Sequence, residues 1–186
     1  MALDPILFEV IGEDDPAPLP EAEGGGLVLY LDTSALIKLY IEEAFSDVVE
    51  HAVSEADEVA TSEIANLEAR AALARLYHEG RMSADDLDRV LGQLKRDLDT
   101  LDLVLYDADL ARAGGDLAGR HGDPPLRAYD ALHLASAQEA FRLLAVSAGH
   151  STPRVLAFDR RLVRAARVEG LRLYFDPFPG QETDGG

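Results

Sequence analysis

The chain has 186 residues, which is the length of one domain and enough to bury a two-sided sheet without covalent cross-links. It contains no cysteine, which excludes disulfides and thiolate metal sites. No apolar run approaches the roughly 18 residues of a membrane helix, and the acidic N-terminus lacks the features of a signal peptide. The sequence therefore predicts a soluble, cytoplasmic protein with no membrane partner.

The net charge of −18 argues at first against a nucleic-acid partner, but this charge is unevenly distributed. Residues 1–26 hold seven acidic residues and no basic one, and their Pro and Gly content predicts a flexible extension. Residues 176–186 hold three acidic residues and no basic one, and we interpret them as a C-terminal tail. Residues 27–175, with 25 acidic and 17 basic residues, form the predicted domain and are only mildly acidic.

Strand and helix patterns alternate along this domain, beginning with an apolar run at 27–31 that is typical of a buried parallel strand. Predicted helices follow over 34–43 and 46–56. The remaining predicted elements are a strand at 58–61, helices at 62–79 and 83–99, a strand at 101–106, helices at 107–121 and 127–146, a strand at 154–158, a helix at 160–169 and a strand at 171–175. This alternation predicts a parallel sheet with helices on both faces.

Two acidic residues directly follow predicted buried strands. Asp32 follows the strand at 27–31, Asp159 follows the strand at 154–158, and each precedes a predicted helix. Parallel strands end at the same edge of a sheet, where open α/β sheets build their sites. Two carboxylates at this edge suggest a metal site. Asp is also a favoured helix N-cap, so each residue taken alone could serve only as a cap.

Two further acidic residues lie on predicted helices among apolar neighbours. Glu68 shares a helix face with Ile64 and Ala72. Asp130 lies in a stretch that is almost free of charge. A carboxylate in such surroundings is costly unless it is paired or bound to a metal. Asp130 could instead cap its helix and Glu68 could be solvated, so spacing alone leaves both interpretations open.

Four segments carry these acids in distinctive surroundings. They are residues 30–40 (YLDTSALIKLY), Thr61-Ser62 with Glu68 six residues after Ser62, residues 126–135 (LRAYDALHLA) and residues 158–162 (FDRRL). In order and spacing they closely resemble the PIN-domain ribonucleases, in particular the VapC-type toxins of bacterial toxin–antitoxin pairs. The resemblance covers about residues 27–175. The chain departs from the family at Ala157, where many relatives carry Thr or Ser.

The resemblance implies a PIN-like three-layer α/β/α fold with a central parallel sheet of about four to five strands. It also implies a compact acidic site that binds Mg²⁺ or Mn²⁺ and hydrolyses RNA phosphodiesters with metal-activated water. An all-oxygen ligand set suits these hard cations, and four converging carboxylates repel one another without a cation. The implied partners are an RNA substrate, a cognate antitoxin and a second copy of the chain in a homodimer. Carried over by position, the catalytic metal ligands are Asp32, Glu68, Asp130 and Asp159.

Nearby polar residues are secondary candidates. Thr33, Ser34 and Ser62 could support the acidic site or act only as hydroxyls at helix starts, and for Ser62 we favour a helix cap. His133, one turn after Asp130, is interpreted as a packed core histidine. Cations in the first turn of a helix are disfavoured by about 0.3–1 kcal/mol, which suggests a phosphate contact for the arginines at 160 and 161, although solvated surface arginines remain the default interpretation. The RNA-binding candidates are Lys38, Arg127, Arg160 and Arg161.

Other classes of protein fit the sequence less well. A receiver domain needs a neighbouring acidic pair and a late Lys, a haloacid-dehalogenase-type phosphatase needs Asp-x-Asp, and no Gly-rich phosphate loop is present. Two alternatives remain open. The chain could be a PIN-fold module that binds RNA or protein without cleavage, or a PIN nuclease that acts outside a toxin–antitoxin pair. Retention of all four acids argues against the first.

Overall fold

The computed structural model describes residues 26–147 and 151–179, so the predicted extension and most of the predicted tail lie outside the described residues. Within these ranges the sheet has four strands, all parallel, in the order β3-β2-β1-β4. The strands are β1 (Gly26–Leu31), β2 (Glu58–Ser62), β3 (Asp102–Val104) and β4 (Ser151–Leu156).

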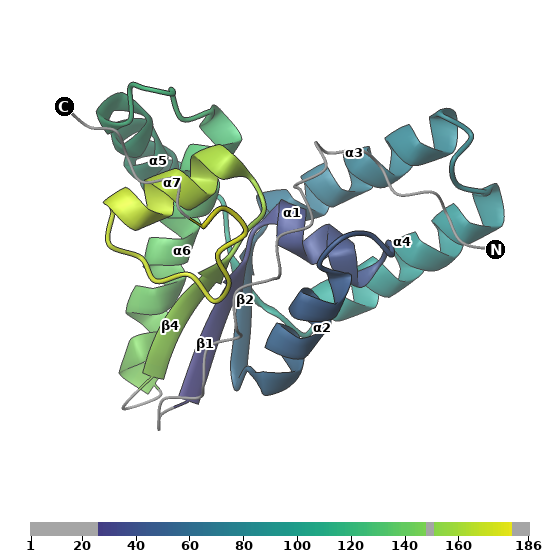
Figure 1. Ribbon diagram of the computed structural model, residues 1–186, viewed down its shortest axis with the longest axis horizontal. Helices are drawn as coiled ribbons and strands as arrows, with labels where there is room; N and C mark the ends of the chain where they lie inside the picture. Colours follow the sequence, from purple (N-terminus) through teal and green to yellow (C-terminus); the bar gives the residue numbers. More distant parts are fainter. Residues whose placement is uncertain (1–25, 148–150, 180–186) are drawn as a thin grey trace.

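Helices cover both faces of this sheet, which confirms the predicted three-layer α/β/α fold (Figure 1). One face carries α1 (Thr33–Leu36), the 3₁₀ helix η1 (Ile37–Leu39), α2 (Ser46–Glu55), α3 (Ile64–His78) and α4 (Ala84–Leu98). The other face carries α5 (Ala108–Arg120), α6 (Ala128–Ser147) and α7 (Arg160–Val168). The α3–α4 pair extends away from the sheet in Figure 1. Among the described helices, none has the length and apolar character needed to span a membrane.

The strand β1 is buried on both faces, which explains its continuous apolar sequence. Because side chains alternate along a strand, Val28 and Tyr30 enter the core formed with α5, α6 and α7, whereas Leu29 and Leu31 enter the opposite core. None of these four side chains is more than 1% exposed. A shift of β1 by one residue would exchange the two sets, so the packing fixes the position at which Asp32 leaves the strand.

The carboxyl ends of β1 and β4 lie side by side. Leu31 pairs with Leu156 in the parallel register, and the backbone nitrogen of Asp32 donates to the carbonyl oxygen of Leu156 at 3.3 Å. The first and last predicted acids, which are 127 positions apart, therefore leave the sheet at neighbouring points.

The predicted helix over 34–43 is interrupted in the structure. It ends as α1 at Leu36 and continues only as the short η1. The chain then reverses, and Phe45 adopts a left-handed backbone with φ of 68°. Its ring lies 5.5 Å from that of Phe158 and 5.4 Å from that of Phe175, so aromatic packing fixes this turn.

Two predicted strands end earlier than expected because the backbone amides that follow them donate to side-chain oxygens. The amide of Tyr106 donates to Glu63 Oε2 at 2.9 Å, and β3 ends at Val104. The amide of Phe158 donates to Ser34 Oγ at 2.7 Å, and β4 ends at Leu156.

The predicted last strand at 171–175 is only a local pairing with the edge of β4. Val155 donates to Arg172 and accepts from Tyr174, each at 2.8 Å, and a single bridge joins Val155 to Leu173. The segment therefore covers one part of the β4 edge without extending the sheet as a full strand.

Candidate active site

Asp32 lies immediately after β1 and is only 4% exposed. Its Oδ1 caps α1 by accepting a hydrogen bond from the Ala35 amide at 3.0 Å. The Ser34 hydroxyl lies 2.7 and 2.9 Å from the two carboxylate oxygens. Burial raises the pKa of Asp32 from 3.8 to about 6, although these hydrogen bonds offset part of the effect. Asp32 is thus a helix cap whose ionised form is unfavourable in this position, and a nearby cation would favour that form.

Glu68, on the second turn of α3, is held by two side chains from other helices. Its Oε2 accepts from Thr33 Oγ1 at 2.6 Å and lies 2.8 Å from His133 Nε2. Burial acts to raise the pKa of Glu68, but the hydrogen bonds from His133 and Thr33 outweigh it and hold the pKa below its ordinary value. Glu68 is therefore an ionised carboxylate in a defined position next to the start of α1.

Asp130 and Asp159 form an acidic pair. Asp159 caps α7 by accepting from the amides of Arg161 at 2.8 Å and Leu162 at 3.2 Å. Asp130 lies in the first turn of α6 and accepts from the Arg127 amide at 3.2 Å. Burial raises the pKa of Asp130, and the charge of Asp159 raises it further. The two negative charges repel each other, so a cation bound nearby would stabilise the ionised form of both carboxylates.

The predicted acids are therefore brought to one edge of the sheet. Asp130 and Asp159 interact through their charges, whereas Asp32 and Glu68 are linked indirectly, because His133 bonds to Glu68 and its charge acts on Asp32. Across residues 26–147 and 151–179, no three His, Asp or Glu side chains are close enough to hold one metal ion together. The donor chemistry nevertheless fits a hard divalent cation, because the set is all carboxylate oxygen. Burial raises the pKa values of Asp32 and Asp130, which is the response expected of acids that lack a counter-charge. Closure around one ion requires side-chain movement from the positions seen here.

Ser62 was expected to cap the helix that follows it, and this prediction is wrong. The side chain is fully buried at the end of β2 and accepts from Ser136 Oγ at 2.9 Å. The helix α3 starts at Ile64, and its N-cap residue Glu63 makes no side-chain capping bond. Ser62 therefore lies in the interior at the end of β2, beside the buried hydroxyl of Tyr30.

The four candidate RNA-binding cations differ in access to solvent. Lys38 is 8% exposed, pairs with Glu43 at 2.6 Å and lies 4.8 Å from the centre of the Phe158 ring. Its ammonium is thus held inside the fold, which argues against a direct contact with RNA. Arg127 and Arg160 are exposed and Arg161 is half-buried, and the charges of Arg127 and Arg161 act on Asp130.

Sequence reasoning missed the contacts of His133. Its burial, at 3% exposure, confirms the predicted packed histidine, but both ring nitrogens also face polar groups of the site. The available signal was its position three residues after Asp130, which places both side chains on one helix face.

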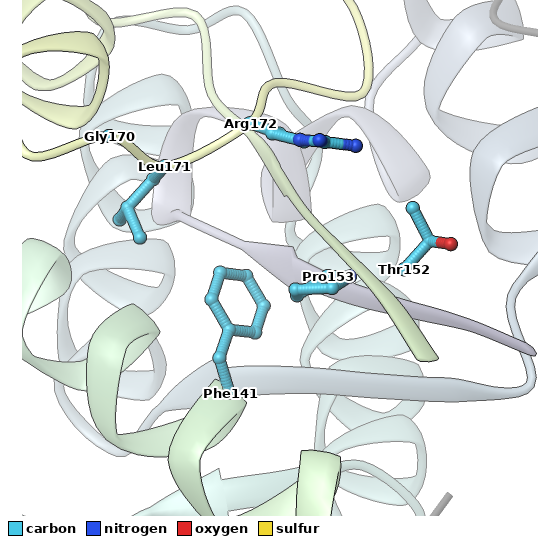
Figure 2. A pocket seen from close by; sticks show the side chains of 6 residues that line it. All are labelled: Phe141, Thr152, Pro153, Gly170, Leu171 and Arg172. Atoms are coloured by element: carbon cyan, nitrogen blue, oxygen red, sulfur yellow. The ribbon is translucent and has the colours of Figure 1, made fainter. Parts of the chain in front are cut away.

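A separate pocket of about 350 Å³ lies beside the first half of β4 (Figure 2). None of the predicted site residues lines it, so it is distinct from the acidic edge. Its lining residues are Phe141, Thr152, Pro153, Gly170, Leu171 and Arg172.

The chain is similar to known proteins along most of its length. The PIN domain family model matches residues 29–168. Ribonuclease VapC35 of Mycobacterium tuberculosis is 31% identical over 156 residues, which cover 83% of this chain and 98% of the relative. Ribonuclease VapC46 of the same organism is 31% identical over 143 residues, covering 77% and 93% respectively.

Solved structures show the same fold. A toxin–antitoxin complex from Klebsiella pneumoniae matches with a TM-score of 0.53 at 20% identity, covering 80% of this chain and 98% of that one. The sarcin–ricin loop cleaving toxin VapC20 of Mycobacterium tuberculosis matches with a TM-score of 0.53 at 19% identity, covering 74% and 94%. The family model spans all four predicted acids, and this chain therefore belongs to the PIN domain family, in the group that contains the VapC ribonucleases.

Proposed function

We propose that the protein is a Mg²⁺- or Mn²⁺-dependent endoribonuclease that acts as the toxin of a toxin–antitoxin pair. The observation that carries the proposal is the acidic edge of the sheet, where Asp130 interacts with Asp159 and His133 links Glu68 to Asp32. Membership of the PIN family supports the assignment, as do curated relatives named as ribonucleases.

In this proposal the four carboxylates hold the metal ion and the neighbouring hydroxyls orient them. When bound, such an ion lowers the pKa of water and stabilises the negative charge of the phosphodiester. Ser34 orients Asp32 by donating to its carboxylate, and Thr33 orients Glu68 in the same way. The chain needs no cysteine or histidine nucleophile for this chemistry, because water attacks the phosphorus.

Arginine side chains next to the acidic pair are the proposed RNA contacts. Arg127 and Arg161 lie close enough to Asp130 for their charges to lower its pKa. Guanidinium groups form paired hydrogen bonds to phosphate oxygens, so both could hold the RNA backbone beside the acids. Arg160 is exposed at the start of α7 and stacks on the Phe178 ring at 4.8 Å. It is the third candidate on this side.

We further propose a protein antitoxin and a homodimer as partners. The matched Klebsiella pneumoniae structure is a toxin–antitoxin complex, which supports the first. Exposed apolar side chains at the β3 edge, namely Leu103, Leu105 and Tyr106, support the second. Sedimentation of the wild type and of Leu105→Glu tests the homodimer by comparing their oligomeric states. A small open reading frame upstream of the gene would support a protein antitoxin.

Cleavage of RNA by the full chain tests the catalytic proposal. Wild type, Asp32→Asn and the control Asp116→Asn are compared with Mg²⁺, with Mn²⁺ and with EDTA. Asp116 is exposed on α5, and its charge is not among the causes that shift the pKa of Asp32, Glu68 or Asp130. We expect EDTA to abolish cleavage and Asp32→Asn to slow it about a hundredfold, since losing a metal ligand costs about 3 kcal/mol of transition-state stabilisation. Equal rates for all three proteins would contradict the metal site, and binding without cleavage would favour the non-cleaving alternative.

A further inference from the structure

A chain of hydrogen bonds runs from the centre of the sheet to the acidic edge. The hydroxyl of Tyr30, in the buried strand β1, lies 2.9 Å from His133 Nδ1. On the other side of the ring, His133 Nε2 lies 2.8 Å from Glu68 Oε2 and 2.9 Å from Thr33 Oγ1. Tyr30 is fully buried, His133 is 3% exposed, and the Glu68 side chain is 25% exposed. The chain of bonds thus leads from the interior towards solvent.

The contact between His133 and Glu68 requires a proton on Nε2. An unprotonated Nε2 would place its lone pair 2.8 Å from a carboxylate oxygen, so Nε2 must be the donor to Glu68. The buried Tyr30 hydroxyl is a phenol 2.9 Å from Nδ1 and can donate its proton to that nitrogen. The phenol therefore selects the imidazole tautomer that donates to the carboxylate.

Both bonds to Glu68 end on the same oxygen. Thr33 donates to Oε2 at 2.6 Å, and His133 donates to Oε2 at 2.8 Å. Neither bond uses Oε1, so the carboxylate is fixed through one oxygen and can bind a ligand with the other. A glutamate side chain has three rotatable bonds, so holding it in one rotamer costs conformational entropy. The two hydrogen bonds to Oε2 offset this cost.

We propose that His133, with its tautomer set by Tyr30, is a positioning residue that fixes Glu68 through Oε2 and leaves Oε1 free to bind the divalent metal ion. This rests on the proposed function, in which Glu68 is a metal ligand. His133 itself binds neither metal nor RNA. Its contribution is to the affinity of the site for the ion, because the carboxylate is already oriented before the ion arrives.

Direct measurement of Mn²⁺ binding to the full chain tests this role independently of catalysis. The variants are His133→Leu, which removes the donor, His133→Gln, which can place an amide N–H near the position of Nε2, and Tyr30→Phe, which removes the tautomer control. His51→Gln is the matched control, because His51 is exposed on α2 and pairs only with Glu55. Thermal unfolding in EDTA, measured on each variant, reports the folding of the metal-free protein.

We expect His133→Leu to weaken Mn²⁺ binding about 10- to 100-fold, as is typical when a group that orients a metal ligand is lost. Tyr30→Phe should weaken it less, His133→Gln should recover most of the affinity, and His51→Gln should match the wild type. A role in packing alone would change the unfolding temperature in EDTA without this rescue. If His133→Leu fails to fold, the Mn²⁺ affinities of Tyr30→Phe and His133→Gln test the positioning role in its place.

Glu68→Gln separates failure of this inference from failure of the proposed function. Weaker Mn²⁺ binding by Glu68→Gln, with unchanged binding by His133→Leu and Tyr30→Phe, would overturn only the positioning role. Unchanged Mn²⁺ binding by Glu68→Gln would remove Glu68 from the ligand set, and the positioning role would fall with it.

Discussion

Ser34 and Phe158 are joined by a hydrogen bond of 2.7 Å, in which the amide of Phe158 donates to the hydroxyl oxygen of Ser34. The same hydroxyl donates its proton to the carboxylate of Asp32. Phe158 directly precedes Asp159, so one serine links the first acid of the chain to the segment that positions the last.

Ser34→Ala should therefore affect both stability and activity. The substitution removes the acceptor of the Phe158 amide and a donor to Asp32, which should lower the free energy of unfolding by about 1–2 kcal/mol. We expect RNA cleavage to slow about tenfold, in the range for groups that orient a metal ligand. Urea denaturation and cleavage rates measure the two effects. The control is Ser54→Ala, an exposed serine of α2, and equal behaviour of the two variants would contradict the link.

Asp32→Asn should stabilise the metal-free protein at neutral pH. The buried carboxylate has a pKa of about 6 compared with 3.8 in an unstructured chain, so its ionised form destabilises the fold. A difference of about two pKa units corresponds to about 3 kcal/mol. Asn keeps an oxygen that can cap α1 but carries no charge. Urea unfolding in EDTA at pH 7 should thus give a higher midpoint for the variant, while Mn²⁺ binding is lost.

The pH dependence of this difference follows from the sign of the shift. Below about pH 4, Asp32 is protonated in both the folded and the unfolded protein, so it contributes no penalty. Between about pH 4 and 6 the unfolded state ionises first, and the stability of the wild type falls relative to Asp32→Asn. Above about pH 6 the difference is constant. A difference that is the same at pH 4 and pH 7 would contradict the burial effect.

Asp159→Asn should lower the pKa of Asp130. The charge of Asp159 is one of the two causes that raise this pKa, and burial is the larger one, so the value should move only part of the way towards 3.8. Carbon NMR titration of the Asp130 carboxyl in EDTA measures the change. Asp116→Asn should leave the Asp130 titration as in the wild type, because the charge of Asp116 is not among the causes of the Asp130 shift. An unchanged titration in Asp159→Asn would show that the two carboxylates do not interact.

Lys38→Met and Arg161→Gln should separate a structural cation from an RNA-binding one. Removing Lys38 leaves Glu43 as an unpaired charge that is 7% exposed, which typically costs about 3–5 kcal/mol of stability. Folded Lys38→Met should bind RNA as the wild type does. Arg161→Gln should keep its stability, and the slope of log Kd against log salt should decrease by about one. Both affinities are measured in the Asp32→Asn background and in EDTA, which together suppress cleavage. A changed salt slope in Lys38→Met would return Lys38 to the RNA-binding set.

The acidic N-terminal extension is expected to weaken RNA binding. Residues 1–25 lie outside the described residues, and we hypothesise that their negative charge shields the basic RNA-facing residues. Deletion of residues 1–22 should therefore strengthen RNA binding at low salt, with a smaller gain at high salt because the charges are then screened. Unchanged RNA affinity and cleavage after the deletion would refute this hypothesis.

The central parts of the fold could be predicted from the sequence because their patterns are local. The apolar run of β1 and the Asp residues that follow β1 and β4 are readable from neighbours in the chain. The alternation of strands and helices also predicted the parallel sheet that is observed.

Other features depend on contacts between distant residues, which no local pattern contains. The Ser34 hydroxyl ends β4 by capturing an amide 124 positions away, and His133 reaches Glu68 across 65 positions. The interaction of Asp130 with Asp159 also joins residues that come from different helices and are not neighbours in the chain. The cap assigned to Ser62 was wrong because its hydroxyl meets Ser136, which is 74 positions away.

The pairing of β1 with β4 also determines when the acidic edge can form during synthesis. Gly26 pairs with Ser151, so the first strand waits for a neighbour 125 residues later in the chain. At about 5–20 residues per second, a ribosome needs about 6–25 s to make that stretch. Until then the nascent chain carries Asp32 and Glu68 without Asp159. A ribosome that translates this protein therefore finishes nearly the whole chain before the proposed active site is complete.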